Sequence, residues 1–399
     1  MRVLQVVKTV DGARWAVDQV RELVSHGIEV HVVLPSMHGR FIEQWRQTGA
    51  QLHELAMDLP VRRPWKLSGL LRSVRRLVET VRPDVIHSHF FGTSLVLRYA
   101  LGSEHTTPRI FQVPGPLHLE HTLFRNWELS TAGSSDFWIG SSRCIIDHYL
   151  KAGIDRERLF LSYYGNCLQP VRSKRGALRS RLGIGHDVKV IGNINYLYPP
   201  KRHLGQSRGL KRHEDVIEAL GRVLSARDDV VGLLIGSQWG GGHSYEERLK
   251  KMADRIGGGR ILMPGHMASE EVLAAWEDFD LAVHVPASEN CGGVVEPLQA
   301  GIPVIAARVG GLPEVVIDGV TGLLVDGGDI DQLAEAMNRT LDHPDELRVM
   351  ARRGQKLVTH MFDVHRTAAE VVGIYRHLLE GSEAPAFFDS NAYAREMVA

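Results

Sequence analysis

Cysteine is scarce in this chain of 399 residues, which has only Cys144, Cys167 and Cys291. An odd number without C-x-x-C spacing predicts neither a disulfide framework nor a zinc site, and it is typical of a reducing cytoplasm. The chain also lacks net charge, because 47 acidic residues balance 47 basic ones. Duplex binding normally needs a basic surface, so nucleic acid is not expected as a partner.

Two common nucleotide-binding motifs are missing as well. The chain has neither a G-x-x-x-x-G-K-[ST] sequence nor a triple-glycine dinucleotide motif, so ATP and NAD chemistry lack their usual signatures. No apolar run reaches the length of a membrane span, and residues 1–7 are too short, with Lys8 directly behind, for a signal peptide. A cytoplasmic protein is therefore expected.

Short apolar strands alternate with helical segments throughout. Uninterrupted apolar strands are typical of parallel sheets buried on both faces. The expected strands are 3–7, 30–34, 85–87, 110–113 and 137–139, then 188–191, 231–235, 261–263, 281–285 and 304–307. The two series are separated by a polar stretch with glycine and proline, and the length exceeds what one core usually supports. The sequence predicts an α/β protein of two Rossmann-like domains facing a central cleft, with ligands beyond the carboxyl ends of the strands.

The most informative segment is 286–305, which reads PASENCGGVVEPLQAGIPVI. Gly292 and Gly293 let the backbone approach a ligand closely, and Pro297 suits the first turn of a helix. The free N–H groups of such a helix bind phosphate. Two carboxylates seven positions apart, Glu289 and Glu296, can accept hydrogen bonds from sugar hydroxyls. The segment predicts a nucleotide-sugar site.

Together with VGGLPEVV at 309–316 and GVTGLLV at 319–325, this segment resembles the donor-binding half of the retaining glycosyltransferases of family four, which have the GT-B fold. The family usually spaces its two glutamates eight positions apart, and here Ser288 occupies the eighth position before Glu296. Either the loop is one residue shorter or Ser288 has replaced the first acid. We favour the shorter loop, because Glu289 keeps an acid beside the glycines.

The resemblance implies a metal-independent, retaining transfer of a sugar from a nucleotide-diphosphate sugar, such as a UDP-sugar, to an acceptor hydroxyl of a glycan, a lipid-linked molecule or a small molecule. It implies that Glu296 holds the ribose and Glu289, as a catalytic residue, a sugar hydroxyl. The donor-binding loop is expected to comprise Asn290, Cys291, Gly292, Gly293 and Val294.

We expect an acceptor-side domain at 1–168, a linker at 169–185, a nucleotide-sugar domain at 186–361 and a tail at 362–399. The resemblance implies that the helices of this tail return to pack on the first domain.

A cation must neutralise the leaving diphosphate, because charge grows on oxygen and no acid or cysteine cluster suited to a metal is evident. Family members place an arginine and a lysine after the first strand of the second domain, but the segment 193–201 lacks the arginine. Lys211, directly before the helical pattern 213–220, is favoured over Lys201 for the catalytic contact with the diphosphate. Arg208 is the candidate for the missing arginine in donor binding.

In the first half, Gly12 follows strand one and permits close approach of a phosphate. His118 follows a Pro-Gly-Pro turn just past a strand end, where the family places a cleft histidine, and is expected to be catalytic. His87 and His89 would share a strand face but lack a third metal ligand, so we interpret them as structural.

The sequence Asp329-Ile330-Asp331 imitates the D-x-D signature of metal-dependent glycosyltransferases. It opens a helical pattern, however, so Asp329 is predicted to be an N-cap and Asp331 to favour the helix dipole.

The segment 62–82 carries seven basic residues against one acid, Glu79, with leucines and valines at helical spacing. Two interpretations stay open. The segment is either a helix that contacts an anionic membrane surface, on the inner membrane face, or an ordinary helix with a basic outer side.

Two other functions also remain. A nucleotide-sugar epimerase of similar fold would need acid–base groups and no acceptor pocket. An inactive nucleotide-sugar-binding protein would explain the altered glutamate spacing and the missing arginine.

Overall fold

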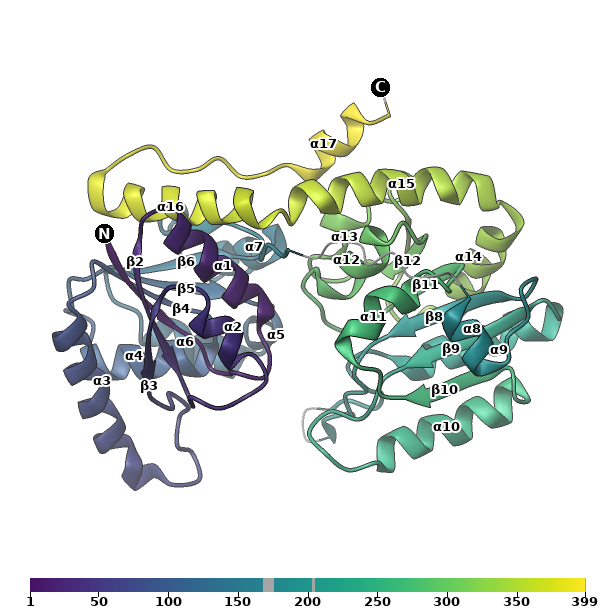
Figure 1. Ribbon diagram of the computed structural model, residues 1–399, viewed down its shortest axis with the longest axis horizontal. Helices are drawn as coiled ribbons and strands as arrows, with labels where there is room; N and C mark the ends of the chain where they lie inside the picture. Colours follow the sequence, from purple (N-terminus) through teal and green to yellow (C-terminus); the bar gives the residue numbers. More distant parts are fainter. Residues whose placement is uncertain (168–175, 203–204, 399) are drawn as a thin grey trace. The chain divides into compact units, whose positions relative to one another are not determined.

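The computed structural model describes residues 1–167, 176–202 and 205–398 (Figure 1). The chain forms two compact units: Met1–Cys167 with His360–Phe388, and Leu168–Thr359 with Asp389–Ala399. Each unit is built on one parallel sheet with helices on its faces, so the predicted α/β class with two Rossmann-like sheets is confirmed.

The sheet of the first unit has seven strands in the order β3-β2-β1-β4-β5-β6-β7, all parallel where they pair. The strands are β1 Arg2–Val6, β2 Glu29–Leu34, β3 Gln51–Glu54, β4 Val85–Ser88, β5 Arg109–Val113, β6 Asp136–Gly140 and β7 Leu159–Leu161. The chain runs outward from β1 to β3 and then crosses back to β4, so the direction of winding changes between β1 and β4.

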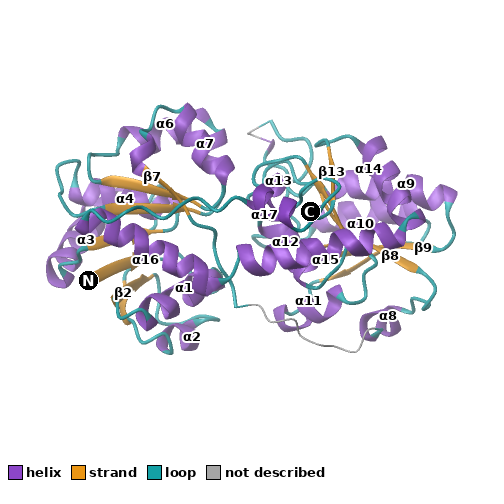
Figure 2. Cartoon of the chain, turned by 90° about the horizontal axis from the view of Figure 1, so that it is seen from above, coloured by secondary structure: helices purple, strands orange, loops and turns teal. Residues whose placement is uncertain are grey.

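Helices cover both faces of this sheet. They are α1 Arg14–Ser25, α2 Ile42–Arg46, α3 Leu67–Val81, α4 Phe91–Leu101, α5 Leu117–Glu120, α6 Thr122–Ser130, α7 Arg143–Lys151 and α16 Val364–Glu380, with 3-10 turns at Pro64–Lys66 and Arg156–Arg158. On one face α1 packs against α16, with Val20 and Val371 in the same core cluster (Figures 1 and 2). On the other face α3 packs against α4 through residues such as Val74 and Val96.

Helix α16 is joined to the centre of the first sheet by Tyr375. The Tyr375 hydroxyl accepts from Gln5 Nε2 at 2.9 Å and shares a hydrogen bond with His87 Nδ1 at 2.6 Å. His89 Nε2 bonds Gln5 Oε1 at 2.6 Å. Burial lowers the pKa of His87 to about 3, so its ring stays neutral. These contacts give the two histidines a structural role inside the first unit.

The sheet of the second unit has six strands in the order β10-β9-β8-β11-β12-β13, again parallel. The strands are β8 Lys189–Ile194, β9 Val230–Ile235, β10 Ile261–Gly265, β11 Leu281–His284, β12 Val304–Ala307 and β13 Leu323–Val325. Here the winding changes direction between β8 and β11, which is where open α/β sheets bind their ligands.

The helices of the second unit are α8 Ala177–Leu182, α9 His213–Ala226, α10 Ser244–Gly257, α11 Ser269–Trp276, α12 Gly292–Gln299, α13 Leu312–Val315, α14 Ile330–Asp342, α15 Pro344–Met361 and α17 Ser390–Glu396. One core cluster unites α9, α10 and α14 with the sheet through Ile217, Leu249 and Met337. The side chain of Asp329 accepts from Gln332 N at 2.9 Å, which confirms the predicted N-cap of α14.

Two of the expected boundaries differ from the structure. Part of the segment 169–185 lies outside the described residues, but from Gly176 onward it is folded into the second unit and is not a linker. Leu178 N donates to Asp278 at 2.7 Å, and Arg179 pairs with Asp280 at 2.6 Å. The buried Asp278 and the half-buried Asp280 hold α8 in place.

The tail also divides, because α16 packs in the first unit whereas α17 contacts α13 in the second. Among the described residues, no helix combines the length and the apolar character needed to cross a membrane.

Candidate functional site

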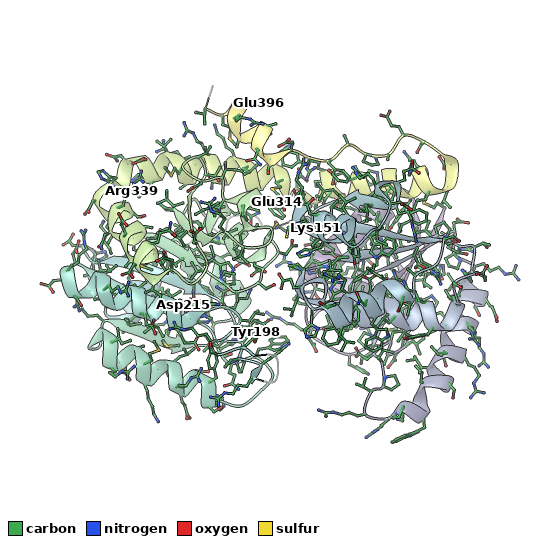
Figure 3. All side chains as sticks on the ribbon, turned by 180° about the vertical axis from the view of Figure 1, so that it is seen from behind. Lys151, Tyr198, Asp215, Glu314, Arg339 and Glu396 are labelled. Atoms are coloured by element: carbon green, nitrogen blue, oxygen red, sulfur yellow. The ribbon has the colours of Figure 1, made fainter. Side chains whose placement is uncertain are left out.

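A cavity of about 370 Å³ lies at the carboxyl ends of the central strands of the second unit. It is lined by Ile194, Asn195, Tyr196, Tyr198, Lys211, Ile235, Gly236, His266, Met267, Val272, Glu289, Gly292, Gly293 and Glu296. Most of these residues end or follow β8, β9, β10 and β11, so the cavity sits beside the change in winding direction. Val272 comes from α11, and Gly292, Gly293 and Glu296 come from α12. Figure 3 marks Tyr198 of this cavity and Asp215 of α9 among the side chains of the same unit.

Lys211 and Glu289 form an ion pair on the cavity wall. Lys211 Nζ donates to Glu289 Oε2, and the same oxygen lies 2.9 Å from His284 Nε2. The two charged side chains are 15% and 13% exposed, so both are mostly desolvated but still reach the cavity. Glu289 Oε1 accepts from Asn290 N at 3.0 Å, which fixes the other end of the carboxylate.

Burial and nearby charges shift the pKa values of the site residues in different directions. Burial raises the pKa of the Glu289 carboxyl, but the Lys211 ammonium and the hydrogen bond with His284 outweigh it and hold the pKa well below its usual range. Burial raises the pKa of Glu296. Burial lowers the pKa of His284 despite its bond with Glu289. Glu289 is thus a firmly ionised carboxylate beside a neutral imidazole.

Two glycines allow this arrangement to pack. A Cβ on Gly293 would lie 2.1 Å from His284 Nε2, so the imidazole fills the space where another residue would place its side chain. Gly310 has φ +57°, and a Cβ there would lie 1.8 Å from the carbonyl oxygen of Glu289. Because Gly310 has no side chain, the loop that carries Glu289 can pack directly against the β12–α13 loop.

The structure brings five of the predicted donor-site residues to the cavity: Lys211, Glu289, Gly292, Gly293 and Glu296. Their neighbours Cys291 and Val294 are buried, and Asn290 is half-buried, in the same loop and first helical turn. The predicted helix is present as the eight-residue α12, which points its free N–H groups toward the loop. It begins at Gly292, however, so Pro297 lies inside the helix and not in its first turn as the sequence predicted.

Arg208 is not brought to this cavity. Its guanidinium donates to Asp215 Oδ1 at 2.6 Å and to Glu218 Oε1 at 3.1 Å, and it lines a separate hollow with Arg248. Lys201 is exposed and does not line the cavity either. Of the three basic candidates, Lys211 is the one with its ammonium group on the cavity wall.

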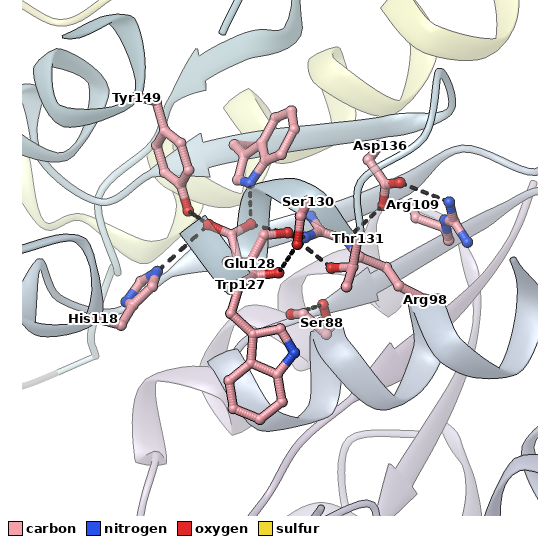
Figure 4. Close-up of polar contacts among 12 residues, drawn as sticks. Ser88, Arg98, Arg109, His118, Trp127, Glu128, Ser130, Thr131, Asp136 and Tyr149 are labelled. Carbon is pink, nitrogen blue, oxygen red and sulfur yellow. Dashed lines mark hydrogen bonds and ion pairs between the residues drawn. The ribbon is translucent and has the colours of Figure 1, made fainter. Parts of the chain in front are cut away.

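His118 and Gly12 belong to the first unit. His118 packs between Phe91 and Phe111, and its Nε2 lies 3.8 Å from Glu128 Oε2 (Figure 4). At Gly12 an added Cβ would meet Thr9 at an ordinary 3.7 Å, so nothing in the chain itself requires a glycine there. Their predicted roles toward a ligand stay predictions.

Glu128 is fully buried and anchors a polar network in that unit (Figure 4). Its oxygens accept from Arg98 Nη1 at 2.9 Å, Trp138 Nε1 at 2.8 Å and the Tyr149 hydroxyl at 2.9 Å. Arg98 also bonds Asp136, at 3.0 Å. Glu128 thus has a partner for each oxygen without any ligand.

Sequence reasoning missed several residues of the cavity. His284 ends an apolar strand, and nothing in its spacing connects it with Glu289. Tyr196, Tyr198 and His266 also went unnoticed, although Tyr196 is 41% exposed beside the 54% exposed Trp239, with ring centroids 4.9 Å apart. The available signal was the aromatic residues in the loops that follow β8 and β9, namely Tyr196, Tyr198 and Trp239. Within the described ranges, no three His, Cys, Asp or Glu side chains gather in a way that could hold a metal ion.

Comparison with known proteins agrees with this picture. Residues 12–165 match the family described as Glycosyltransferase Family 4, and residues 203–357 match Glycosyl transferases group 1. Three relatives named D-inositol 3-phosphate glycosyltransferase come from Mycolicibacterium smegmatis, Thermobispora bispora and Frankia alni. They are 27%, 27% and 30% identical to this chain, over 70%, 92% and 74% of it. The matches cover 65%, 89% and 74% of the relatives, so the chain spans slightly less than two thirds of the first.

Among solved structures, Anabaena HepE in complex with UDP-glucose matches with a TM-score of 0.77 and 21% identity, over 93% of this chain and 99% of that one. Sucrose-phosphate synthase from Thermosynechococcus elongatus matches with a TM-score of 0.75 and 18% identity, over 96% of this chain and 100% of that one. The fold predicted from the sequence, GT-B, is confirmed.

Proposed function

The chain belongs to glycosyltransferase family 4, and from that membership we propose that it moves a sugar from a nucleoside-diphosphate sugar to an acceptor hydroxyl. The observation that carries the proposal is the cavity of the second unit, where Lys211, Glu289, Glu296 and the start of α12 line one space. A cation, two carboxylates and free backbone N–H groups match the diphosphate, the hydroxyls and the phosphate oxygens of such a donor.

Each group has a distinct role in the proposal. Lys211 and the N-terminus of α12 stabilise the diphosphate as charge develops on it. Glu296 accepts hydrogen bonds from the ribose hydroxyls, and Glu289 from a hydroxyl of the transferred sugar. For His118 of the first unit we propose the catalytic role that the family resemblance implies.

We propose that the transfer retains the anomeric configuration and needs no metal. The bond between the anomeric carbon and the diphosphate oxygen breaks, the acceptor oxygen bonds to the same face of that carbon, and the acceptor proton passes to the leaving diphosphate. Lys211 supplies the positive charge for this step, so activity should survive excess EDTA. Recovery of lost turnover by added manganese would overturn the metal-independent mechanism.

The donor is identified by a binding screen. UDP-, GDP- and ADP-glucose are compared by thermal unfolding, because a ligand at a hundredfold excess over its dissociation constant stabilises the protein by about 2.7 kcal/mol. UDP-glucose is the first candidate, since HepE binds it, and the names of the relatives make D-inositol 3-phosphate the first acceptor to test.

Acceptor-dependent release of the free nucleotide separates the three candidate functions. A glycosyltransferase releases nucleotide when the acceptor is added, and the configuration of its product tests retention. An epimerase converts the nucleotide sugar without an acceptor. An inactive binding protein is stabilised by the donor and releases nothing under either condition.

We propose in addition that the region around α3 contacts an anionic membrane surface. The loop before α3 presents Val61 at 79% and Trp65 at 72% exposure, and Arg62, Arg63 and Lys66 beside them are exposed as well. Only one face of α3 is buried, at Val74, Val78 and Val81. An exposed tryptophan among basic residues suits the interface between lipid headgroups and acyl chains.

Vesicle co-sedimentation tests the membrane contact. Binding to vesicles of phosphatidylglycerol and phosphatidylcholine should weaken with salt and in the Arg72→Ser, Arg75→Ser, Arg76→Ser triple variant, each charge contributing about 1 kcal/mol. A matched triple variant on α15 of the second unit, with Arg348, Arg352 and Lys356 changed to Ser, should bind as the wild type does. Equal loss in both triple variants, or no sedimentation at low salt, would leave α3 as an ordinary packed helix.

A further inference from the structure

His284 lies at the end of β11 and connects two groups of the cavity wall. Its side chain is buried, with 3% exposed, and its ring makes one contact from each nitrogen. Nε2 lies 2.9 Å from Glu289 Oε2, and Nδ1 lies 3.4 Å from Asn195 Nδ2. The imidazole therefore bridges the residue that follows β8 and the acid that precedes α12.

The partners fix which nitrogen carries the proton. An ionised carboxylate can only accept, so Nε2 of His284 must be the N–H that donates to Glu289. Burial lowers the pKa of His284, so the ring is neutral and Nδ1 keeps its lone pair, which accepts from the amide N–H of Asn195. Asn195 thus selects the tautomer that donates to Glu289.

The proposed function requires Lys211 to change partner. Lys211 donates to Glu289, so the two charges neutralise each other. Once a diphosphate enters, the same ammonium faces a stronger anion. Glu289 would then keep only two partners, His284 and the N–H of Asn290, within the described part of the chain.

We propose that His284 is a positioning residue that keeps Glu289 aimed at the transferred sugar when Lys211 moves from Glu289 to the diphosphate. The proposal rests on the proposed function. Gly293 is needed for this contact between His284 and Glu289, because the imidazole occupies the space where a side chain at position 293 would lie. His284 provides a fixed hydrogen bond to the acid that stands beside Gly292 and Gly293.

A pair of polar substitutions isolates this hydrogen bond. In His284→Gln the side-chain amide reaches the position of Nε2 and can still donate to Glu289. In His284→Asn the amide reaches only the position of Nδ1 and keeps the contact with Asn195 but not the one with Glu289. Both variants leave a polar group of similar size in the same place.

His213 supplies the matched control. It is a fully buried histidine two residues after Lys211, and neither of its ring nitrogens has a hydrogen-bond partner among the described residues. His213→Asn therefore removes a buried imidazole from the same unit without removing a bond to Glu289, and it should leave the affinity for both ligands unchanged.

The measurement is the affinity for UDP and for UDP-glucose by isothermal titration calorimetry. Glu289 contacts only the sugar in our proposal, so His284→Asn should weaken UDP-glucose by roughly tenfold to a hundredfold, the effect of one hydrogen bond to a charged group, and leave UDP within about twofold. His284→Gln should keep most of the affinity for UDP-glucose. The turnover of the two variants should follow the same order.

Three results would overturn parts of this scheme and can be told apart. Equal losses for UDP and UDP-glucose in His284→Asn would show that His284 only supports the fold. Unchanged affinities would show that Glu289 is held without it. If the wild type binds neither these two ligands nor the GDP and ADP counterparts, the proposed function itself fails, and with it the role of His284.

Discussion

Each unit holds a largely desolvated carboxylate with a cation and a histidine nearby, yet the two carboxylates lie in different surroundings. Glu128 in the first unit is fully buried and accepts from Arg98, Trp138 and Tyr149. Glu289 in the second unit accepts from Lys211 and faces an open space of about 370 Å³. Both oxygens of Glu128 have hydrogen-bond partners within the chain, whereas the Glu289 pair has its cation on a cavity wall.

Contact with a cavity distinguishes a carboxylate with a structural role from one with a proposed binding role better than burial or charge does. Burial raises the pKa of Glu128, but His118 and Arg98 outweigh it and lower the pKa, as Lys211 and His284 do for Glu289. Both acids are therefore ionised at neutral pH. What distinguishes them is whether the partner cation can exchange its acid for a ligand. Arg98 also bonds Asp136, whereas the Lys211 ammonium bonds Glu289 on the wall of the cavity.

The largest expected effect is the loss of the Glu128 network. Glu128→Gln leaves the buried Arg98 with half of its charge partners and should lower the free energy of unfolding by about 3–5 kcal/mol. Urea unfolding followed by circular dichroism measures this change. The exposed Glu120→Gln on α5 is the control and should stay within about 0.5 kcal/mol. A change below about 1 kcal/mol in Glu128→Gln would mean that the first network is not a closed structural unit.

Lys211→Ala should instead change catalysis. A lysine that meets the diphosphate as charge grows on it contributes mainly to the transition state, so kcat should fall on the order of a hundredfold to a thousandfold with a smaller change in donor affinity. Lys201→Ala should cost far less, because Lys201 is exposed and outside the cavity. The reverse order in steady-state kinetics would show that the segment 202–210 is an insertion after the phosphate site.

A smaller effect should separate the two glutamates of the donor loop. Burial raises the pKa of Glu296, so its acid form becomes populated at a higher pH than for an ordinary glutamate. Affinity for UDP-glucose, whose diphosphate does not itself titrate in this range, should therefore fall as the pH decreases through this raised pKa, while Glu289 stays ionised. Titrations across pH in the wild type should show the loss, and Glu296→Gln, about tenfold weaker at neutral pH, should be flat. A pH dependence that survives in Glu296→Gln would assign it to another group.

The smallest effect is expected at Arg208. Its guanidinium is paired with Asp215 and Glu218 and does not reach the cavity, so Arg208→Gln should change kcat by less than about threefold. A large loss, together with small losses in Lys211→Ala and Lys201→Ala, would transfer the phosphate role to Arg208.

The strands could be predicted where they are apolar and central. All ten expected strands are present, but three more were not expected: β3, β7 and β13. β3 reads Gln-Leu-His-Glu and has no buried residue, and the other two have three residues each. These three strands lie at the edges of their sheets, where backbone pairing needs no long apolar run.

The site could be predicted where the chemistry is local in the chain. Glu289, the glycines and Glu296 stand within one loop and helix, and Lys211 was found from the helix that follows it. Arg208 was misplaced because the acids that bind it lie seven and ten positions later on α9, where the sequence shows only an ordinary polar helix face. His284 was missed because only the folded loop brings it to Glu289.

Tyr375 carries a consequence for how the protein is made. The hydroxyl that hydrogen-bonds both Gln5 and His87 comes from a residue 370 positions after Gln5. A ribosome must therefore translate residues 168–359, which make up most of the second unit, before the first unit can close its interior. We expect the first sheet of a nascent chain arrested after Cys167 to remain accessible to proteases. The time needed to synthesise residues 168–359 therefore sets the earliest moment at which the first unit can finish folding.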